Sequence, residues 1–167
     1  MCNGHPPILE TRRLHWPDEA ACAAFAQQLA ALPASAGLAD AFIALHGELG
    51  AGKTTFVRHL LQALGVAGRI KSPTYTVLEP YTLPGLAISH LDFYRFDDPR
   101  EWADAGLRDV FAAPGLKLAE WPDKAGVALP RPDLALHIET RDDSQRDITL
   151  HAHTQRGLAL LPLRAAR

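Results

Sequence analysis

The sequence GELGAGKTT, residues 47–55, stands between an apolar run and a segment with helical spacing. The apolar run is AFIAL, residues 41–45, whose length and composition favour a buried strand. The segment KTTFVRHLLQALG repeats apolar residues every three or four positions and ends in a glycine, which is typical of a helix. Residues 47–55 match G-x-x-x-x-G-K-[ST] in the strand–loop–helix context that this pattern requires. The sequence therefore predicts a phosphate-binding loop.

The residue types in this loop suit a nucleoside triphosphate. A glycine-rich turn can direct successive backbone N–H groups into one concavity, and the start of the next helix adds partial positive charge. The Lys53 ammonium can reach the β and γ phosphates, and the Thr54 hydroxyl can ligate Mg²⁺. The alternative, a glycine-rich turn that only caps a helix, seldom meets the whole pattern. We predict a nucleoside triphosphate and Mg²⁺ as cofactors, with ATP or GTP left open by these residues. Nucleotide contacts are expected from the whole loop: Gly47, Glu48, Leu49, Gly50, Ala51, Gly52, Lys53, Thr54 and Thr55.

Two acidic residues can complete such a site. Asp92 ends the candidate strand LAISHLD, and Glu120 ends the candidate strand LKLAE. Ligands of open α/β sheets bind beyond the carboxyl ends of the strands, so both carboxylates are expected to face the loop. One of them can hold the metal while the other orients the attacking water, and the sequence leaves this assignment open. The alternative is that each is a solvated acid at a strand end. The catalytic candidates are Lys53, Asp92 and Glu120.

Other polar and aromatic residues near these motifs have two interpretations each. Thr74, in KSPTYT, is a candidate switch-like hydroxyl beside the γ phosphate or an ordinary strand residue after a Ser-Pro turn. Trp121 either packs against the nucleotide or belongs to the core. The eight histidines show no zinc-like spacing on a predicted helix, so His46 and His90 are interpreted as structural.

The composition is that of an ordinary soluble globular protein. The chain has 167 residues, of which 47% are hydrophobic and 22% charged, and this length suits one domain over residues 1–167. Its formal net charge of −2 gives no general basic field for nucleic acid, and no basic run indicates a membrane surface. The N-terminus has no apolar signal core, and the two cysteines form no disulfide framework. We therefore expect a cytoplasmic protein.

The remaining pattern predicts an α/β fold of the P-loop NTPase class. Its central sheet should be mainly parallel, with antiparallel additions, and flanked by helices. Helices are expected at residues 17–32, capped by Asp18, at 53–64 and at 98–111, capped near Asp97 or Asp98. Strands are expected near residues 8–16, 41–45, 75–81, 86–92 and 116–120, followed by a hairpin of 133–140 with 146–154. Residues from Gln155 onward give no clear pattern.

Four motifs together give the chain a family resemblance: GELGAGKTT (47–55), KSPTYT (71–76), HLDFYRF (90–96) and AEWPDK (119–124). In order and spacing the chain resembles the bacterial tRNA threonylcarbamoyladenosine biosynthesis ATPase family, TsaE. The resemblance covers about residues 14–140 and is more specific than the phosphate loop alone. The chain departs from the family at position 48, where Glu stands in place of the usual Asp. Residues 1–13 and the tail after about residue 147 match no family segment.

The resemblance implies a small P-loop ATPase that acts with two partner proteins, TsaB and TsaD. Together they install the threonylcarbamoyl group on adenosine 37 of tRNAs that read codons beginning with A. The transfer chemistry belongs to TsaD, and ATP hydrolysis, slow without partners, supports or resets the complex. The family's phosphate-loop lysine and metal-binding threonine correspond to Lys53 and Thr54. Its other site positions fall on Thr74, Asp92, Glu120 and Trp121, and Glu120 becomes the better candidate for the metal shell.

Two alternatives remain open at this stage. A small-molecule kinase has the same P-loop fold, but such kinases need an arginine-bearing lid and an acceptor pocket. No arginine-rich lid follows AEWPDK, which counts against a kinase. A nucleotide-dependent switch module with little hydrolysis of its own is the second alternative. Because the net charge is low, any contact with tRNA is expected to be indirect, through the partners.

Overall fold

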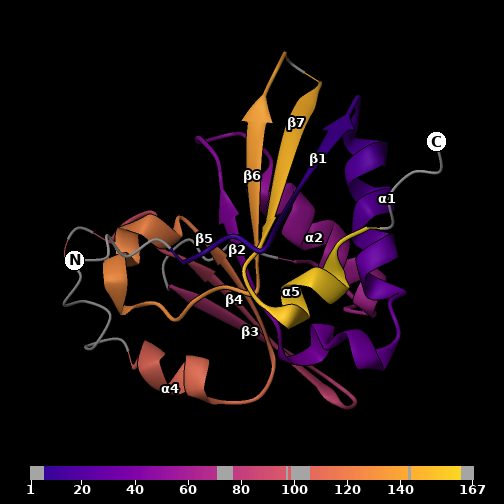
Figure 1. Cartoon of the computed structure of the whole chain (residues 1–167). Helices are drawn as coiled ribbons and strands as arrows, with labels where there is room; N and C mark the ends of the chain where they lie inside the picture. The colour runs from indigo at the N-terminus through magenta and orange to yellow at the C-terminus, as the bar shows by residue number, and fades with distance from the viewer. Residues whose placement is uncertain (1–5, 71–76, 97, 99–105, 143, 163–167) are drawn as a thin grey trace.

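The computed structural model describes residues 6–70, 77–96, 98, 106–142 and 144–162. Within them, the chain forms a seven-stranded sheet in the order β1-β7-β6-β2-β5-β4-β3 (Figure 1). The strands are β1 (Glu10–Trp16), β2 (Phe42–His46), β3 (Leu78–Leu83), β4 (Leu86–Asp92), β5 (Leu116–Glu120), β6 (Leu134–Thr140) and β7 (Arg146–Ala152).

The centre of the sheet is parallel and its two sides are antiparallel. Strand β2 runs parallel to both β5 and β6, and β4 runs parallel to β5. The antiparallel pairs are β6 with β7, β1 with β7, and β3 with β4. The predicted fold class, the edge strand at the start of the chain and the hairpin near its end are therefore confirmed. The strand expected near 75–81 is observed as β3, two or three residues later, and residues 75–76 lie outside the described part.

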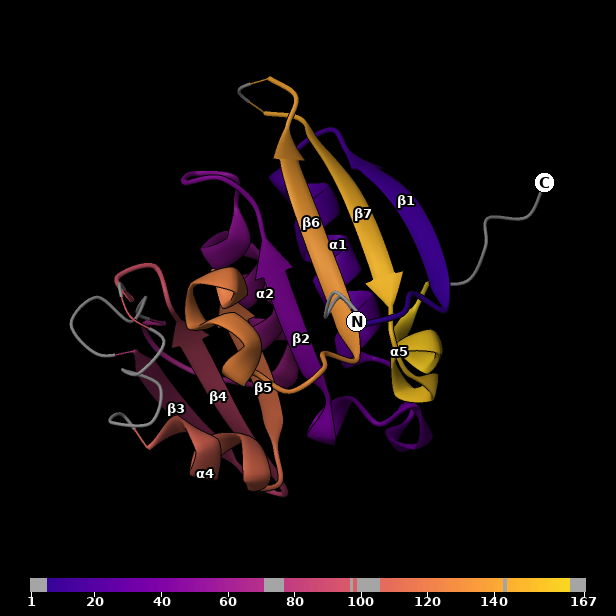
Figure 2. The same ribbon diagram turned by 60° about the vertical axis from the view of Figure 1, so that its left-hand side comes forward.

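Helices cover both faces of this sheet (Figures 1 and 2). The helices α1 (Glu19–Ala30) and α2 (Lys53–Leu64) lie together on one face, and α4 (Leu107–Ala112) and the 3₁₀ segment η3 (Pro122–Ala128) lie on the other. Short 3₁₀ turns, η1 (Ala34–Ala36) and η2 (Leu38–Asp40), occupy the predicted linker, and α5 (Gln155–Leu160) lies near the end of the chain.

The helix ends follow their local sequence signals. The Asp18 carboxylate caps α1 by accepting a hydrogen bond from the Ala21 N–H at 3.0 Å. Gly65 ends α2 in the left-handed conformation at φ 108°. For the helix predicted at 98–111, only α4 falls within the described residues, since 99–105 and one predicted cap, Asp97, lie outside them. Helix α5, which the sequence pattern did not predict, is capped by the Thr154 hydroxyl, which accepts from the Gly157 N–H at 3.0 Å.

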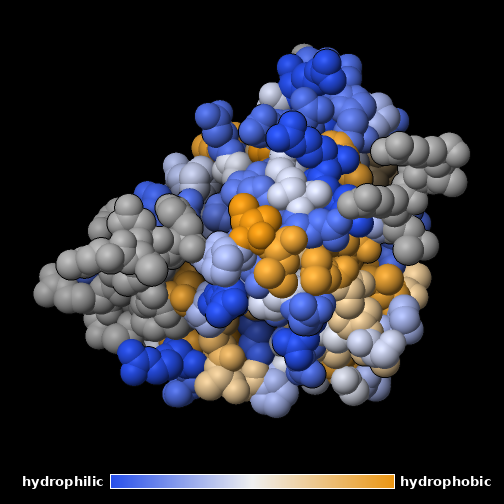
Figure 3. All heavy atoms as spheres, in the orientation of Figure 1, coloured by the Kyte–Doolittle hydropathy of each residue, from blue (hydrophilic) through white to orange (hydrophobic). Residues whose placement is uncertain are grey.

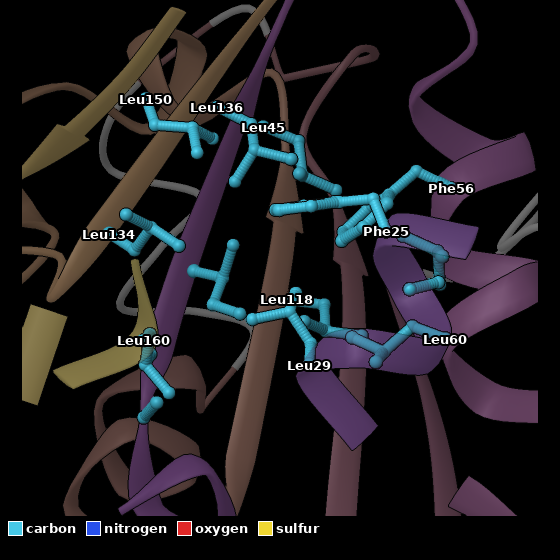
Figure 4. Close-up of a cluster of buried hydrophobic side chains, with 14 of the residues drawn as sticks. Phe25, Leu29, Leu45, Phe56, Leu60, Leu118, Leu134, Leu136, Leu150 and Leu160 are labelled. Carbon is cyan, nitrogen blue, oxygen red and sulfur yellow. The ribbon is translucent and has the colours of Figure 1, made fainter. Parts of the chain in front are cut away.

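The main hydrophobic core joins α1 and α2 to the sheet (Figure 4). Leu45, Leu118 and Leu136, from three neighbouring strands, are fully buried. Phe56 of α2 is also fully buried and packs on Phe25 of α1 with ring centroids 5.8 Å apart. Each such side chain stabilises the fold by about 1.5–3 kcal/mol. This packing fixes β2 against α2, so the loop between them has a rigid strand before it and a rigid helix after it.

The surface in the view of Figure 1 is mostly polar, with a group of apolar side chains near its middle (Figure 3). Two apolar residues just before β1, Ile8 and Leu9, are about half exposed. Among the described residues, the structure contains no helix with the length and hydrophobicity needed to cross a bilayer.

Candidate active site

The loop of residues 47–52 connects β2 to α2 at the carboxyl end of the parallel strands. Gly52 precedes α2 with φ 112°, a left-handed conformation that favours glycine. At Gly47 a Cβ would lie 2.7 Å from the carbonyl oxygen of Ile138 on β6, so a larger residue would push the loop off the sheet. The turn is closed by the Ala51 N–H, which donates to the Glu48 carbonyl at 3.0 Å. These features hold the backbone in a compact turn at the helix start.

Lys53 is the first residue of α2, and its side chain folds back over the loop. It is only 4% exposed, and its Nζ donates to the carbonyl oxygens of Gly47 at 2.5 Å and Glu48 at 2.8 Å. The ammonium also lies 4.2 Å from the ring centroid of Trp121, a cation–π contact. Burial lowers the pKa of Lys53, and the nearby carboxylates of Glu120 and Asp92 oppose that shift. The ammonium is therefore held by weak acceptors that an anionic ligand can replace.

Thr54 and Glu120 meet directly across the site. The Thr54 hydroxyl lies 2.8 Å and 3.1 Å from the two carboxylate oxygens of Glu120, to which it donates. Glu120 is the last residue of β5 and is only 2% exposed. The two groups proposed to hold the metal thus contact each other, although they are 66 residues apart in the sequence. Hydroxyl and carboxylate oxygens are hard donors of the kind that Mg²⁺ prefers.

Asp92 ends β4 directly beside Glu120. The two residues are register partners on the parallel strands β4 and β5. Burial raises the pKa of Asp92, and the neighbouring Glu120 carboxylate raises it further, while a hydrogen bond from the Tyr94 N–H at 2.9 Å lowers it. A carboxylate with a raised pKa is a better proton acceptor than an ordinary surface aspartate.

His90 lies behind the site, in contact with Glu120, and the sequence interpretation of it as structural did not foresee this contact. The residue is completely buried, and its Nε2 lies 2.6 Å from a carboxylate oxygen of Glu120. Its Nδ1 is buried and has no hydrogen-bond partner among the described residues. His90 and Asp92 are two positions apart on β4, and residues at this spacing share one face of a strand. That alternation in HLD was the available signal, but spacing alone could not show that Glu120 would lie beside it.

Trp121 forms one wall of the site and has a strained backbone. Among the described residues it alone is a non-glycine with positive φ, at 55°. Such a conformation costs of order 1–3 kcal/mol and is most often retained at functional positions. Its ring packs on Tyr94 with centroids 5.0 Å apart, in addition to its contact with Lys53. Trp121 is therefore beside the loop, and it also packs against the smaller hydrophobic cluster that contains Phe93.

These groups surround a cavity of about 280 Å³. Every residue that lines it, apart from Tyr94, was predicted from the sequence. The lining residues are Leu49, Gly50, Gly52, Lys53, Thr54, Thr55, Asp92, Tyr94, Glu120 and Trp121. Gly47, Glu48 and Ala51 contribute to the loop backbone and do not line the cavity. Thr74 lies outside the described residues.

The donor set fits a magnesium ion that is shared with a ligand. No group of three or more His, Cys, Asp or Glu residues in the described part of the chain could hold a metal by itself. Mg²⁺ in phosphate-transferring sites commonly takes one or two protein ligands and completes its shell with phosphate oxygens and water. Thr54 and Glu120 can supply those protein ligands. The geometry therefore fits Mg²⁺ with a bound polyphosphate.

A second, larger cavity lies elsewhere on the sheet. It has a volume of about 870 Å³ and is lined in part by four histidines, His46, His137, His151 and His153. The rings of His46 and His137 stack with centroids 4.4 Å apart. None of the predicted site residues lines this cavity, so size alone does not identify the functional site here.

Comparisons with known proteins identify a family for this chain. A family model described as "Threonylcarbamoyl adenosine biosynthesis protein TsaE" matches residues 16–148. A relative from Haemophilus influenzae is 45% identical over 113 residues, which are 68% of this chain and 71% of the relative. A relative from Bacillus subtilis is 37% identical over 110 residues, 66% of this chain and 68% of the relative. Both are named tRNA threonylcarbamoyladenosine biosynthesis protein TsaE.

A solved structure has the same fold. The crystal structure of Bacillus subtilis YdiB superposes with a TM-score of 0.73 at 28% sequence identity. The superposition covers 90% of this chain and 91% of that chain. The overall fold is thus that of a protein of known structure.

Proposed function

The chain belongs to the threonylcarbamoyl adenosine biosynthesis protein TsaE family, and we propose that it is a Mg²⁺-dependent ATPase in the biosynthesis of threonylcarbamoyladenosine in tRNA. The resemblance indicated by the four sequence motifs is thereby confirmed as to family. The observation that carries the proposed activity is the contact between Thr54 and Glu120 beside the buried ammonium of Lys53. It joins the two expected metal-binding groups and the expected phosphate-binding group in one small cavity.

Nucleotide binding in this proposal exchanges one set of contacts for another. The Lys53 ammonium leaves the carbonyl oxygens of Gly47 and Glu48 and binds the β and γ phosphates. Because phosphate oxygens carry charge and these carbonyls do not, the exchange strengthens the hydrogen bonds. The first N–H groups of α2 and those of the loop surround the phosphates. Lys53 then stabilises the negative charge that develops on the transferred phosphoryl group.

Thr54 and Glu120 are the residues that would hold Mg²⁺, and the bound ion would neutralise part of the phosphate charge. Their hydrogen bond in this structure places both oxygens where an ion can separate them. His90 holds Glu120 in position from behind, through its 2.6 Å contact with the carboxylate. With Glu120 on the metal, Asp92 is the residue left to orient a water molecule and accept its proton. The raised pKa of Asp92 suits that role.

Partner proteins complete the proposed function. From the family resemblance we propose TsaB and TsaD as partners, a cytoplasmic location and slow ATP hydrolysis in their absence. The formal net charge of −2 favours tRNA contacts made mainly by the partners. Hydrolysis by this chain would support or reset the partner complex, while the group transfer takes place on TsaD.

The test is steady-state hydrolysis of Mg-ATP by the purified chain, alone and with TsaB and TsaD. We expect slow turnover that rises when both partners are present. Turnover that ignores the partners but rises with a small hydroxylated metabolite, with a phosphorylated product formed, would indicate a kinase instead. Tight Mg-ATP binding without hydrolysis in either setting would indicate a nucleotide-dependent switch.

A further inference from the structure

Arg146 contacts the phosphate loop from a distant part of the chain. It is the first residue of β7, and its Nε donates to the carbonyl oxygen of Ala51 at 2.8 Å. The two residues are 95 positions apart, and no sequence motif joined them. We propose that Arg146 is a positioning residue that fixes the phosphate loop in its phosphate-binding orientation. This inference rests on the proposed nucleotide binding and adds a residue to it.

The contact matters because it fixes the orientation of the peptide bond between Ala51 and Gly52. In a trans peptide the C=O and the next N–H point in opposite directions. When Arg146 holds the Ala51 carbonyl on the outer side of the loop, the Gly52 N–H must point to the other side. Gly52 lines the cavity beside Lys53, so that other side is where phosphate would lie. The Arg146 guanidinium therefore orients the Gly52 N–H toward the phosphate site without contacting the phosphate itself.

This peptide needs an external anchor because glycines surround it. Gly50 has φ 81° and Gly52 has φ 112°, and glycine adopts positive and negative φ with similar ease. A flip of the Ala51–Gly52 peptide would turn the carbonyl oxygen toward the cavity, where it would repel an anion. A charge-assisted hydrogen bond is strong enough to favour one of the two orientations.

The β6–β7 hairpin holds the guanidinium in place. Arg146 Nη1 donates to the carbonyl oxygens of Asp142 and Gln145, both at 2.9 Å. The Asp142 carboxylate in turn accepts from the N–H groups of Ser144 at 3.1 Å and Gln145 at 3.0 Å. The hairpin turn thus orients the arginine, and the arginine orients the loop.

The experiment measures the affinity for Mg-ADP by calorimetry in the full chain and in four variants. Arg146→Met keeps the hydrocarbon stem and removes the donors, and Arg146→Lys restores one charged donor. Arg141→Met is the matched control, since Arg141 flanks the same hairpin turn on its β6 side, is exposed and pairs with Asp147 at 3.8 Å. Asp142→Ala loosens the turn without removing the guanidinium. Hydrogen exchange of loop peptides and thermal unfolding are recorded for each.

We expect Arg146→Met to weaken Mg-ADP binding about tenfold, with Arg146→Lys in between and Arg141→Met unchanged. Exchange of residues 50–54 should quicken in Arg146→Met while thermal unfolding stays close to that of the parent. Equal affinity in Arg146→Met and the parent would overturn the inference. Asp142→Ala should cause a smaller loss, because the turn that orients the guanidinium is loosened while the guanidinium remains. An equal loss in Arg141→Met would also overturn the inference, because any change to the hairpin, and not removal of the Arg146 guanidinium, would then be responsible. If the parent protein binds no Mg-ADP, the proposed function is wrong, and the inference that rests on it is wrong as well.

Discussion

Two buried lysines at opposite ends of the sheet show what distinguishes the site from the scaffold. Lys53 is 4% exposed and Lys117 is 6% exposed, and burial lowers the pKa of both. Each ammonium donates to two backbone carbonyls, those of Gly47 and Glu48 for Lys53. For Lys117, at the start of β5, they are the carbonyls of Ala113 and Gly115. Burial, charge and hydrogen bonds are therefore nearly the same at the two ends.

The difference lies in what surrounds the ammonium. Lys53 faces a cavity and has Glu120, Asp92 and the Trp121 ring near it, so its carbonyl partners can be exchanged for a ligand. Lys117 anchors the turn before β5, and the Asp40 carboxylate near it opposes the lowering of its pKa. A buried charge thus indicates a functional site only when its partners can be replaced.

The largest effect should come from Lys53→Met, which keeps the hydrocarbon and removes the charge. We expect hydrolysis of Mg-ATP to fall by about a hundredfold or more, because the β and γ phosphates lose their cationic partner. Steady-state kinetics measure this. Near-parental turnover in a folded Lys53→Met protein would show that Lys53 is not needed for hydrolysis, and the contrast with Lys117 would then fail.

Glu120→Gln should separate hydrolysis from binding at the same end of the sheet. The amide keeps the shape but lowers the charge in the proposed metal shell, so we expect turnover to fall by about a hundredfold. Nucleotide binding, measured by calorimetry, should change by no more than about threefold. A loss of binding as large as the loss of turnover would make Glu120 a binding residue only.

Lys117→Met should lower the stability of the protein and leave its nucleotide affinity unchanged. The change leaves the carbonyls of Ala113 and Gly115 without their ammonium donor, and we expect the free energy of unfolding to fall by about 1–2 kcal/mol. Urea denaturation measures that loss, and calorimetry should give parental affinity for Mg-ADP. If Lys117→Met weakened the nucleotide as Lys53→Met does, the two ends of the sheet would not be functionally distinct.

His137, on β6, offers a third and smaller contrast, because burial lowers the pKa of a histidine there. Burial and the neighbouring His46 lower the pKa of His137 from 6.5 to about 4. Between those values the unfolded chain binds more protons, so stability present above pH 6.5 is lost as the pH falls toward 4. After allowance for partial exposure of the ring, we expect a loss of about 1 kcal/mol between pH 7 and pH 5.

Urea unfolding at the two pH values, in the parent and in His137→Gln, checks this expectation. The variant should lose less stability on acidification than the parent does. An identical loss in both proteins would show that another group carries the pH dependence.

The sequence predicted the features of the fold and site that depend on local residue patterns. Residues 47–55 predicted the loop, its strand and its helix, and the ends of LAISHLD and LKLAE predicted Asp92 and Glu120 at the same edge of the sheet. A parallel arrangement limits the order of the strands but does not fix it. The sequence therefore could not show which side chains are in contact. The α5 helix was missed because its six residues carry too little periodicity to be read as a helix.

His90 and Arg146 were missed for a different reason. The partner of His90 is Glu120, 30 positions away, and the partner of Arg146 is Ala51, 95 positions away. Nothing in a single sequence marks such pairs, since a buried histidine and a hairpin arginine are both common without function. They became visible only when the sheet order placed β4 beside β5, and the hairpin beside the loop.

The most direct test of the central claim, that the loop of residues 47–55 binds a magnesium nucleotide, is a crystal structure of the chain with Mg-ADP. We expect the phosphates inside this loop, with Lys53 Nζ moved from the Glu48 carbonyl to a phosphate oxygen. We also expect the hydrogen bond between Thr54 and Glu120 to be opened by the ion. A fully bound nucleotide at another place, with the contacts of Lys53 and Thr54 unchanged, would contradict the claim.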